Sequence, residues 1–299
     1  MLDVTLLGTG GMTPLPERYL TSLAVRYNGE TIIVDCGEGT QMAAREAGIS
    51  LSKISVICIT HVHADHIAGM PGLLLTIGNA ERTSPLTIIG PHGIGHIVDS
   101  LRVIAPQLPY KIEYIEATNG EVFNMGSFTI SARAVRHRIP CYAYKFELPR
   151  AGKFNAEKAQ ASGLPVRYWS FLQRGEAVEF EGQVHDPSEF TGAPRRGLKV
   201  SYSTDTRPSG ALVEFARESD LFVCEGMYGD PAQLPKAKER FHCMFEEAAT
   251  MAKRAEVREL WLTHFSPSMP KPQEYLHLAQ AIFPNTVIGK NSVELRFEE

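Results

Sequence analysis

A dense run of metal-binding residue types follows a buried strand early in the chain. Thr60-His61-Val62-His63-Ala64-Asp65-His66 comes directly after the apolar run 54–59, whose β-branched residues predict a strand. We therefore expect the histidines on the loop that leaves the carboxyl end of this strand. His61 and His63 alternate and can face one ion, whereas Asp65 and His66 can face another. One ion rarely needs four ligands packed this tightly, so the spacing predicts a two-metal hydrolase. The alternative is a polar surface loop.

Three lone polar residues at the ends of other predicted strands complete a possible ligand set. They are His137 after 128–135, Asp205 after 198–202 and His264 after 260–263. Taken alone, each would more often be an ordinary polar residue than a ligand. Taken with the histidine-rich loop, they are candidates because the ends of strands converge on one rim of a sheet. Asp35 and Glu225 also follow strands, and we expect them to orient the ligands through hydrogen bonds.

Length and composition limit the classes of protein to which this chain can belong. Its 299 residues, 43% of them hydrophobic, suffice for one large domain or two closely packed ones. No run of 18 apolar residues is present, and the N-terminus does not resemble a signal peptide. Five scattered cysteines without close spacing favour a reducing cytoplasm. The net charge of −4 is unusual for an RNA-binding protein, but it does not exclude a local basic surface.

Short strands alternate with helical segments along most of the chain, which predicts an α/β fold with sheets covered by helices. We expect a hairpin turn at Asn28-Gly29-Glu30 and helices at 94–104, 245–255 and 273–282. The stretch 150–196 departs from this alternation, since it carries several glycines, prolines and charged residues and one short helical pattern at 155–162. A connection of this length usually has a function of its own or is disordered.

Several motifs together resemble the ribonuclease Z family of the metallo-β-lactamase superfamily. They are the histidine-rich loop, Leu7-Gly8-Thr9-Gly10-Gly11, Asp35-Cys36-Gly37-Glu38-Gly39-Thr40-Gln41, Gly69-Met70-Pro71-Gly72-Leu73 and Leu262-Thr263-His264-Phe265-Ser266. The resemblance implies an αββα sandwich in one domain, 1–299, with 150–196 inserted as a flexible arm that grips the tRNA elbow. It implies an endoribonuclease that removes 3′ trailers from tRNA precursors and forms a homodimer.

The resemblance also assigns roles to individual residues. His61, His63 and His137 match ligands of a first metal, and a second set, Asp65, His66 and His264, matches those of the other. Asp205 matches the bridging aspartate. Asp65 is the expected acceptor of the proton of the attacking water, and His242 is the expected proton donor to the departing 3′ oxygen. The two divalent ions are expected to be zinc, with manganese or iron as alternatives.

Two other functions are compatible with the motifs. One is a small-substrate phosphodiesterase of the same fold, against which the long insertion argues. The other is a non-catalytic RNA-binding or scaffold protein, in which lost ligands would be expected. The chain departs from the family pattern at Cys243-Met244, Ser268-Met269 and Leu164-Pro165-Val166, positions at which we expect RNA contacts. His92 and His96 are four residues apart but lack the glutamate of a helical metal motif, so we interpret them as surface residues.

Overall fold

The computed structural model describes residues 1–289 and 292–297, and these form two compact units. The larger unit comprises Met1–Glu147 and Lys199–Arg296, and the smaller is built from Leu148–Leu198. The smaller unit therefore spans the segment 150–196 that breaks the alternation of strands and helices. Among the described helices, none has the length and apolar character needed to cross a membrane.

The first sheet of the larger unit is built from the six N-terminal strands and the last strand of the chain, β16. Its order is β16-β1-β2-β3-β4-β5-β6, in which β1 to β3 pair antiparallel and β3 to β6 pair parallel. The tight turn between β2 and β3 is the expected one, since Asn28 and Gly29 both have positive φ. The strands are β1 Leu2–Gly8, β2 Ser22–Tyr27, β3 Glu30–Val34, β4 Ile54–Cys58, β5 Leu86–Gly90, β6 Ile112–Glu116 and β16 Val293–Leu295.

The second sheet has the same number of strands, in the order β15-β14-β13-β12-β9-β8-β7. Its strands β12 to β15 pair parallel, and β7, β8 and β9 form an antiparallel meander. The central parallel strands β13 and β14 are completely buried, as expected where both faces of a sheet are covered. The strands are β7 Val122–Met125, β8 Phe128–Ala134, β9 Tyr142–Arg150, β12 Arg195–Ser203, β13 Leu221–Glu225, β14 Leu260–Thr263 and β15 Thr286–Ile288.

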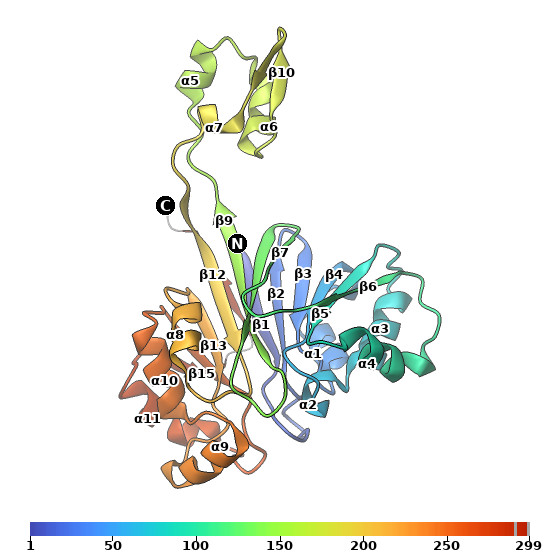
Figure 1. The fold of residues 1–299 in the computed structure, drawn as a ribbon, viewed down its shortest axis with the longest axis vertical. Helices are drawn as coiled ribbons and strands as arrows, with labels where there is room; N and C mark the ends of the chain where they lie inside the picture. Colours follow the sequence, from blue (N-terminus) through green and yellow to red (C-terminus); the bar gives the residue numbers. More distant parts are fainter. Residues whose placement is uncertain (290–291, 298–299) are drawn as a thin grey trace. The chain divides into compact units, whose positions relative to one another are not determined.

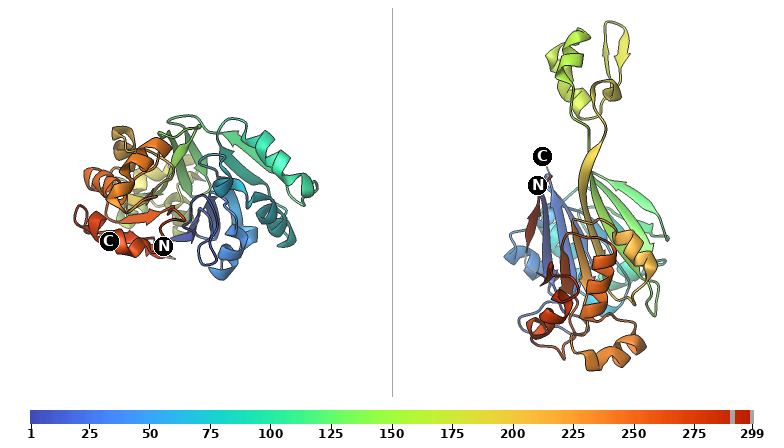
Figure 2. Two further views of the ribbon diagram at one scale, coloured as in Figure 1. Left: turned by 90° about the horizontal axis from the view of Figure 1, so that it is seen from below. Right: turned by 90° about the vertical axis from the view of Figure 1, so that its left-hand side faces the viewer.

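Helices cover the outer face of each sheet, so the larger unit is an αββα sandwich (Figures 1 and 2). The first sheet packs against α1 Thr40–Glu46, α3 Met70–Asn79 and α4 Ile94–Leu101 through one apolar core. The second packs against α8 Gly210–Ala216, α10 Phe245–Arg254 and α11 Leu276–Gln280 through another. The expected fold class is confirmed. Two expected helices are shorter than predicted, because 3₁₀ turns occupy Arg102–Ile104 and Pro272–Tyr275.

The two sheets also contact each other directly. The rings of Tyr27 in β2 and Phe128 in β8 lie 6.4 Å apart, edge to face. The hydroxyl of Tyr144 in β9 donates to the carbonyl of Ile59, 2.9 Å away, just beyond β4. Backbone N–H of Tyr142 donates to Thr60 O at 3.0 Å. These contacts hold the loop after β4 against the second sheet, so residues from both sheets can meet there.

The smaller unit has a small apolar core of its own. It contains α5 Ala156–Ala161, the 3₁₀ turn Val166–Tyr168, α6 Trp169–Gln173, the hairpin β10 Val178–Phe180 and β11 Gln183–His185, and α7 Pro187–Phe190. Asn155 caps α5 by accepting a hydrogen bond from the N–H of Lys158, which explains the predicted helix at 155–162. Leu164, Leu172 and Phe190 are buried in this core. His185 is also buried in this core, where its ring lies 5.9 Å from that of Phe190.

Candidate metal centre

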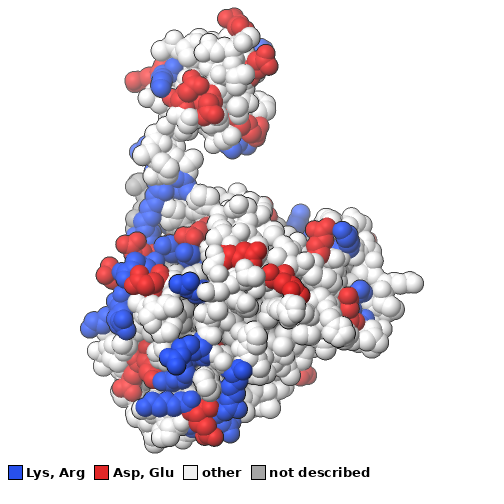
Figure 3. Space-filling view, in the orientation of Figure 1, with Lys and Arg blue, Asp and Glu red and all other residues white. Residues whose placement is uncertain are grey.

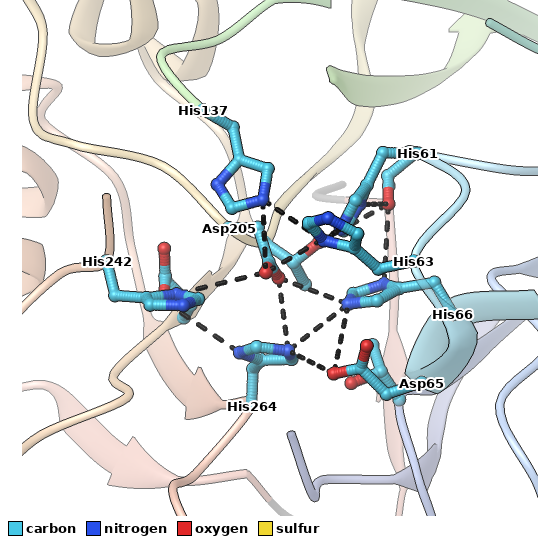
Figure 4. A network of polar contacts seen from close by, with 12 residues as sticks. His61, His63, Asp65, His66, His137, Asp205, His242 and His264 are labelled. Atoms are coloured by element: carbon cyan, nitrogen blue, oxygen red, sulfur yellow. Dashed lines mark hydrogen bonds and ion pairs between the residues drawn. The ribbon is translucent and has the colours of Figure 1, made fainter. Parts of the chain in front are cut away.

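Residues that directly follow strands of both sheets build one polar cluster (Figure 4). His61 lies just beyond β4, Asp205 beyond β12 and His264 beyond β14. Asp205 and His264 have φ of 40° and 57°, and Asp35, beyond β3, has φ of 59°. Non-glycine residues rarely adopt this left-handed conformation, which costs on the order of 1–3 kcal/mol each. Strain of this kind, at three residues in or beside one cluster, is typical of a functional site.

The first group of side chains comprises His61, His63, His137 and Asp205. Nδ1 of His63 lies 2.9 Å from Nε2 of His61 and 3.3 Å from Nε2 of His137. Oδ2 of Asp205 lies 3.6 Å and 3.8 Å from the same two Nε2 atoms. Three imidazole nitrogens and one carboxylate oxygen therefore face a common point, as in a tetrahedral zinc site.

The second group comprises Asp65, His66 and His264. Nε2 of His66 and Nε2 of His264 lie 3.2 Å apart, and Oδ2 of Asp65 lies 3.7 Å and 3.3 Å from them. Oδ1 of Asp205 lies 3.1 Å from the Nε2 of His66 and 3.0 Å from that of His264. Asp205 thus presents one carboxylate oxygen to each group. The structure brings all seven sequence-predicted residues together and places Asp205 between the two groups. Asp205, His242 and His264 form a third group whose ligand atoms lie close to one another.

Asp35 fixes the orientation of the histidine-rich loop. Its Oδ2 lies 2.8 Å from Nδ1 of His66, and its Oδ1 accepts from the N–H of Thr60 at 2.8 Å. An imidazole that donates its Nδ1 proton to a carboxylate leaves the Nε2 lone pair free, and metal-binding histidines usually have such a partner. The geometry therefore suits a cation facing Nε2 of His66, and Asp35 has the orienting position predicted for it.

The glycine-rich loop after β1 packs tightly against the second group. The N–H of Met12 donates to Oδ2 of Asp65 at 2.7 Å. A Cβ on Gly11 would lie 2.8 Å from Cε1 of His264, closer than real contacts allow. Only glycine therefore fits at position 11 without displacing His264. Arg18 lies on the same loop and donates to the carbonyls of Met269 and Pro270, which joins this loop to the segment after His264.

The electrostatics keep ligand lone pairs available in the first group. Burial lowers the pKa of His61 and His63, and it lowers the pKa of His137 to about 4. These imidazoles are therefore neutral at neutral pH. Burial opposes ionisation of Asp205, but the surrounding imidazoles, first of all those of His264 and His66, outweigh it and hold the pKa of Asp205 well below its usual value. Neutral imidazoles and an ionised carboxylate are the forms that bind divalent ions.

His242 lies beside the ligand groups, but its Nδ1 is engaged by a different carboxylate. Nδ1 is 3.0 Å from Oε2 of Glu225, a residue that is itself held by the N–H of Thr206. Burial opposes protonation of His242, but the charge and hydrogen bond of Glu225 outweigh it and raise the pKa of the imidazole. The ring also stacks on His264, with centroids 5.7 Å apart. The arrangement favours a protonated His242 at the edge of the cavity, with Nδ1 engaged by Glu225.

A cavity of about 330 Å³ opens onto both groups and contains residues that the sequence analysis missed. Met12, Met227, Arg138, Glu239 and Arg240 line it beside the predicted side chains. Two of them could have been found from the sequence, because they lie next to predicted site residues: Arg138 follows His137, and Arg240 comes two residues before His242. His92 and His96 lie outside the cluster and are exposed, as expected.

The fold and the cluster of histidines and aspartates define a protein of the metallo-β-lactamase fold. The structure is similar to the Bacillus subtilis metallo-β-lactamase fold protein YhfI, with a TM-score of 0.70, 19% identity and 98% of each chain covered. It is equally similar to the short form of human tRNase Z (ELAC1), with a TM-score of 0.70, 24% identity and coverage of 99% of this chain and 100% of that one. A family model described as anti-Pycsar protein Apyc1 matches residues 2–141.

Sequence relatives identify the family. Ribonuclease Z of Agathobacter rectalis is 54% identical over 302 aligned positions that cover 100% of both chains. Ribonuclease Z of Clostridium kluyveri is 51% identical, with 97% of both chains covered. The chain therefore belongs to the ribonuclease Z family.

Proposed function

We propose that this chain is a metal-dependent endoribonuclease that removes 3′ trailers from tRNA precursors. The observation that carries the proposal is the presence of two ligand groups that share Asp205 in a chain of the ribonuclease Z family. Oδ2 of Asp205 faces the first group and Oδ1 the second. A carboxylate in this position suits two cations about 3.5–4 Å apart, the arrangement used in hydrolysis of phosphate esters.

The seven ligands fit two divalent cations, and we propose zinc. His61, His63 and His137 would hold one ion, Asp65, His66 and His264 the other, and Asp205 both. The donors are mostly imidazole nitrogens, which suit zinc and also accept manganese or iron. Such ions supply activation of water and stabilisation of the charge that develops on phosphoryl oxygens.

Asp65 and His242 are the residues that we propose for proton transfer. Asp65 borders the cavity, and its ionised carboxylate can accept the proton of the attacking water. Oδ2 of Asp65 is already held by the N–H of Met12, which fixes the orientation of the carboxylate. On the other side of Asp205, the protonated His242 can donate a proton from Nε2 to the departing 3′ oxygen (Figure 4).

For the smaller unit we propose a role in binding the body of the tRNA. Its own core allows it to fold as an element separate from the ligand groups. It exposes the apolar side chains Val166 and Phe171 beside basic residues such as Arg167 and Arg174. Family membership supports a homodimer, and five free, buried cysteines suit a cytoplasmic protein.

A cleavage assay on a defined precursor tests the proposed function. The purified protein is incubated with a tRNA precursor that carries a 3′ trailer, and the new 3′ end is mapped. The expected product has its new 3′ end at the outer end of the acceptor stem, where the trailer begins. Asp205→Ala, matched in concentration, is expected to give no product. A parent protein with full metal content that leaves the precursor intact would contradict the proposal. Hydrolysis of bis-p-nitrophenyl phosphate in that case would favour a small-substrate phosphodiesterase.

A further inference from the structure

Two arginines border the cavity at the side where His137 and His242 enter it. Arg138 directly follows His137, and Arg240 is the last residue of α9 Leu234–Arg240. Both line the cavity, and both side chains are exposed. A guanidinium nitrogen of Arg138 donates to the carbonyl of Glu239 at 2.8 Å, which connects the loop after β8 to the end of α9. This contact holds the segment that carries Arg138 against the segment that carries Arg240.

Neither guanidinium is neutralised by a carboxylate within the described part of the chain. The recorded contact of Arg138 is to a backbone carbonyl, and no ion pair of Arg240 is found among the described residues. The nearby acidic residue Glu239 also lines the cavity, but Lys236 and Lys238 on α9 add two further positive charges. Figure 3 shows Lys and Arg side chains gathered at the end of the larger unit where Figure 1 places α9. A chain of net charge −4 thus has a local basic surface beside its ligand groups.

The position of His242 indicates which part of an RNA strand would meet this surface. In the proposed reaction the scissile phosphate stays with the trailer, and the oxygen that leaves belongs to the last nucleotide of the tRNA. His242 is the proposed donor to that oxygen, so its side of the cavity receives the strand 5′ to the cut. The rings of His137 and His242 lie 5.8 Å apart, and Figure 4 shows both on the side of Asp205 away from Asp65. Arg138 and Arg240 are on the same two segments.

We propose that Arg138 and Arg240 clamp the backbone phosphates on the 5′ side of the cut, with Lys236, one helical turn before Arg240 on α9, extending this basic surface along the acceptor stem. The proposal rests on the proposed function. A guanidinium matches a phosphate through two parallel hydrogen bonds, which makes arginine suited to fixing a strand in register. The clamp contacts phosphates and sugars, so it selects no base sequence. Its role is to position the scissile phosphate relative to the ligand groups and His242.

The test combines arginine variants with precursors in which one phosphate is neutral. Arg138→Gln, Arg240→Gln and the double variant are compared with the parent on three substrates. One is the unmodified precursor, one carries a methylphosphonate at the phosphate immediately 5′ to the scissile one, and one carries it in the trailer, 3′ to the scissile one. Lys111→Gln, at an exposed lysine before β6, is the control for loss of one positive charge. Metal content and circular dichroism show whether each variant is folded.

Each arginine variant is expected to lower kcat/KM on the unmodified precursor about tenfold, and to reduce the salt dependence of binding by about one unit of log–log slope. The 5′ methylphosphonate is expected to impair the parent but to cause little further loss in the double variant. The trailer methylphosphonate is expected to impair the parent and the double variant by the same factor. Lys111→Gln is expected to behave as the parent.

Two results would overturn the clamp. One is a double variant that cuts the unmodified precursor at the parent rate with the parent's salt dependence. The other is that the double variant and the parent cut the precursor with the trailer methylphosphonate equally well, but not the one with the 5′ methylphosphonate. This would place the arginines on the opposite side of the cut. A parent protein that cuts no precursor would contradict the proposed function itself, and the unmodified substrate reveals that outcome before any variant is compared.

Discussion

Oε2 of Glu225 lies 3.0 Å from Nδ1 of His242, and this contact joins the end of β13 to the turn between α9 and α10. Arg207 holds the same turn from another side, since it donates to the carbonyl of His242 and pairs with Glu247 of α10. The imidazole is thus fixed through both its ring and its backbone. A side chain held in this way, with Nε2 unengaged by Glu225, is suited to proton donation.

Replacement of His242 by alanine is expected to slow cleavage of a tRNA precursor strongly. A positioned general acid contributes on the order of 100- to 10,000-fold to the rate. Because Nδ1 of His242 is bound to Glu225, the variant is expected to keep its full complement of metal, measured by inductively coupled plasma mass spectrometry. An unchanged rate would remove His242 from the mechanism, and loss of metal would give it a structural role.

Replacement of Glu225 by glutamine is expected to change the pH dependence of the same reaction. Glu225 raises the pKa of His242 against the effect of burial, so the imidazole of the parent stays protonated to a higher pH. Without that charge the pKa of His242 falls, and the acid form is lost at lower pH. The alkaline limb of the kcat profile is therefore expected to move to lower pH. An alkaline limb at the parent's position, in a variant with full metal content, would contradict this role of Glu225.

The parent protein is expected to bind two divalent ions per chain. His137 contributes only to the first ligand group, so His137→Ala is expected to lower the content to about one ion per chain. Asp205 serves both groups, so Asp205→Ala is expected to lose more metal than His137→Ala does. Well under one ion per chain in carefully prepared parent protein would count against a dinuclear site. Equal losses in the two variants would count against the bridging position of Asp205.

Gly11→Ala is expected to perturb the second ligand group selectively. The new methyl group would approach Cε1 of His264 to 2.8 Å in a fully buried environment, so His264 must shift. Overpacking of this kind costs about 1–3 kcal/mol, and the displaced imidazole should also weaken metal binding. Gly210→Ala is the matched control, because a Cβ at Gly210 meets no atom within 4 Å. If the two variants have the same melting temperature and the same metal content, Gly11 is not tightly packed.

Deletion of residues 152–194, bridged by a short glycine linker, is expected to abolish cleavage of a tRNA precursor and to spare hydrolysis of bis-p-nitrophenyl phosphate. All seven ligands and His242 lie outside this span. Its ends are close, since Nε of Arg195 donates to the carbonyl of Ala151 at 3.0 Å, so a short linker can close the gap. A small diester has no remote body from which to gain binding energy. A folded, metal-loaded variant that cuts the precursor at the parent rate would rule out the tRNA-binding role of the smaller unit.

Local sequence patterns predicted most of the elements of this protein. Alternating and continuous apolar runs located β4, β8, β12 and β14, because a buried strand needs an apolar side chain at every inward position. The smaller unit's hairpin β10–β11 was missed, since its strands have three residues each and show too little periodicity to be recognised. The histidine-rich loop was evident because its ligands are neighbours in the chain.

The sequence by itself therefore determined the long buried strands, the residue types of the cluster and the glycines that its loops require. The tertiary structure alone decided that His137, Asp205 and His264 meet the loop at 61–66, because their approach depends on how two sheets stack and where strands from each sheet end. It also decided the left-handed conformations of Asp205 and His264, which cost energy in any residue with a Cβ and which packing must sustain. The contact of Arg138 with the end of α9 was likewise decided by the tertiary structure. Its residues are about 100 positions apart, so local periodicity cannot predict it.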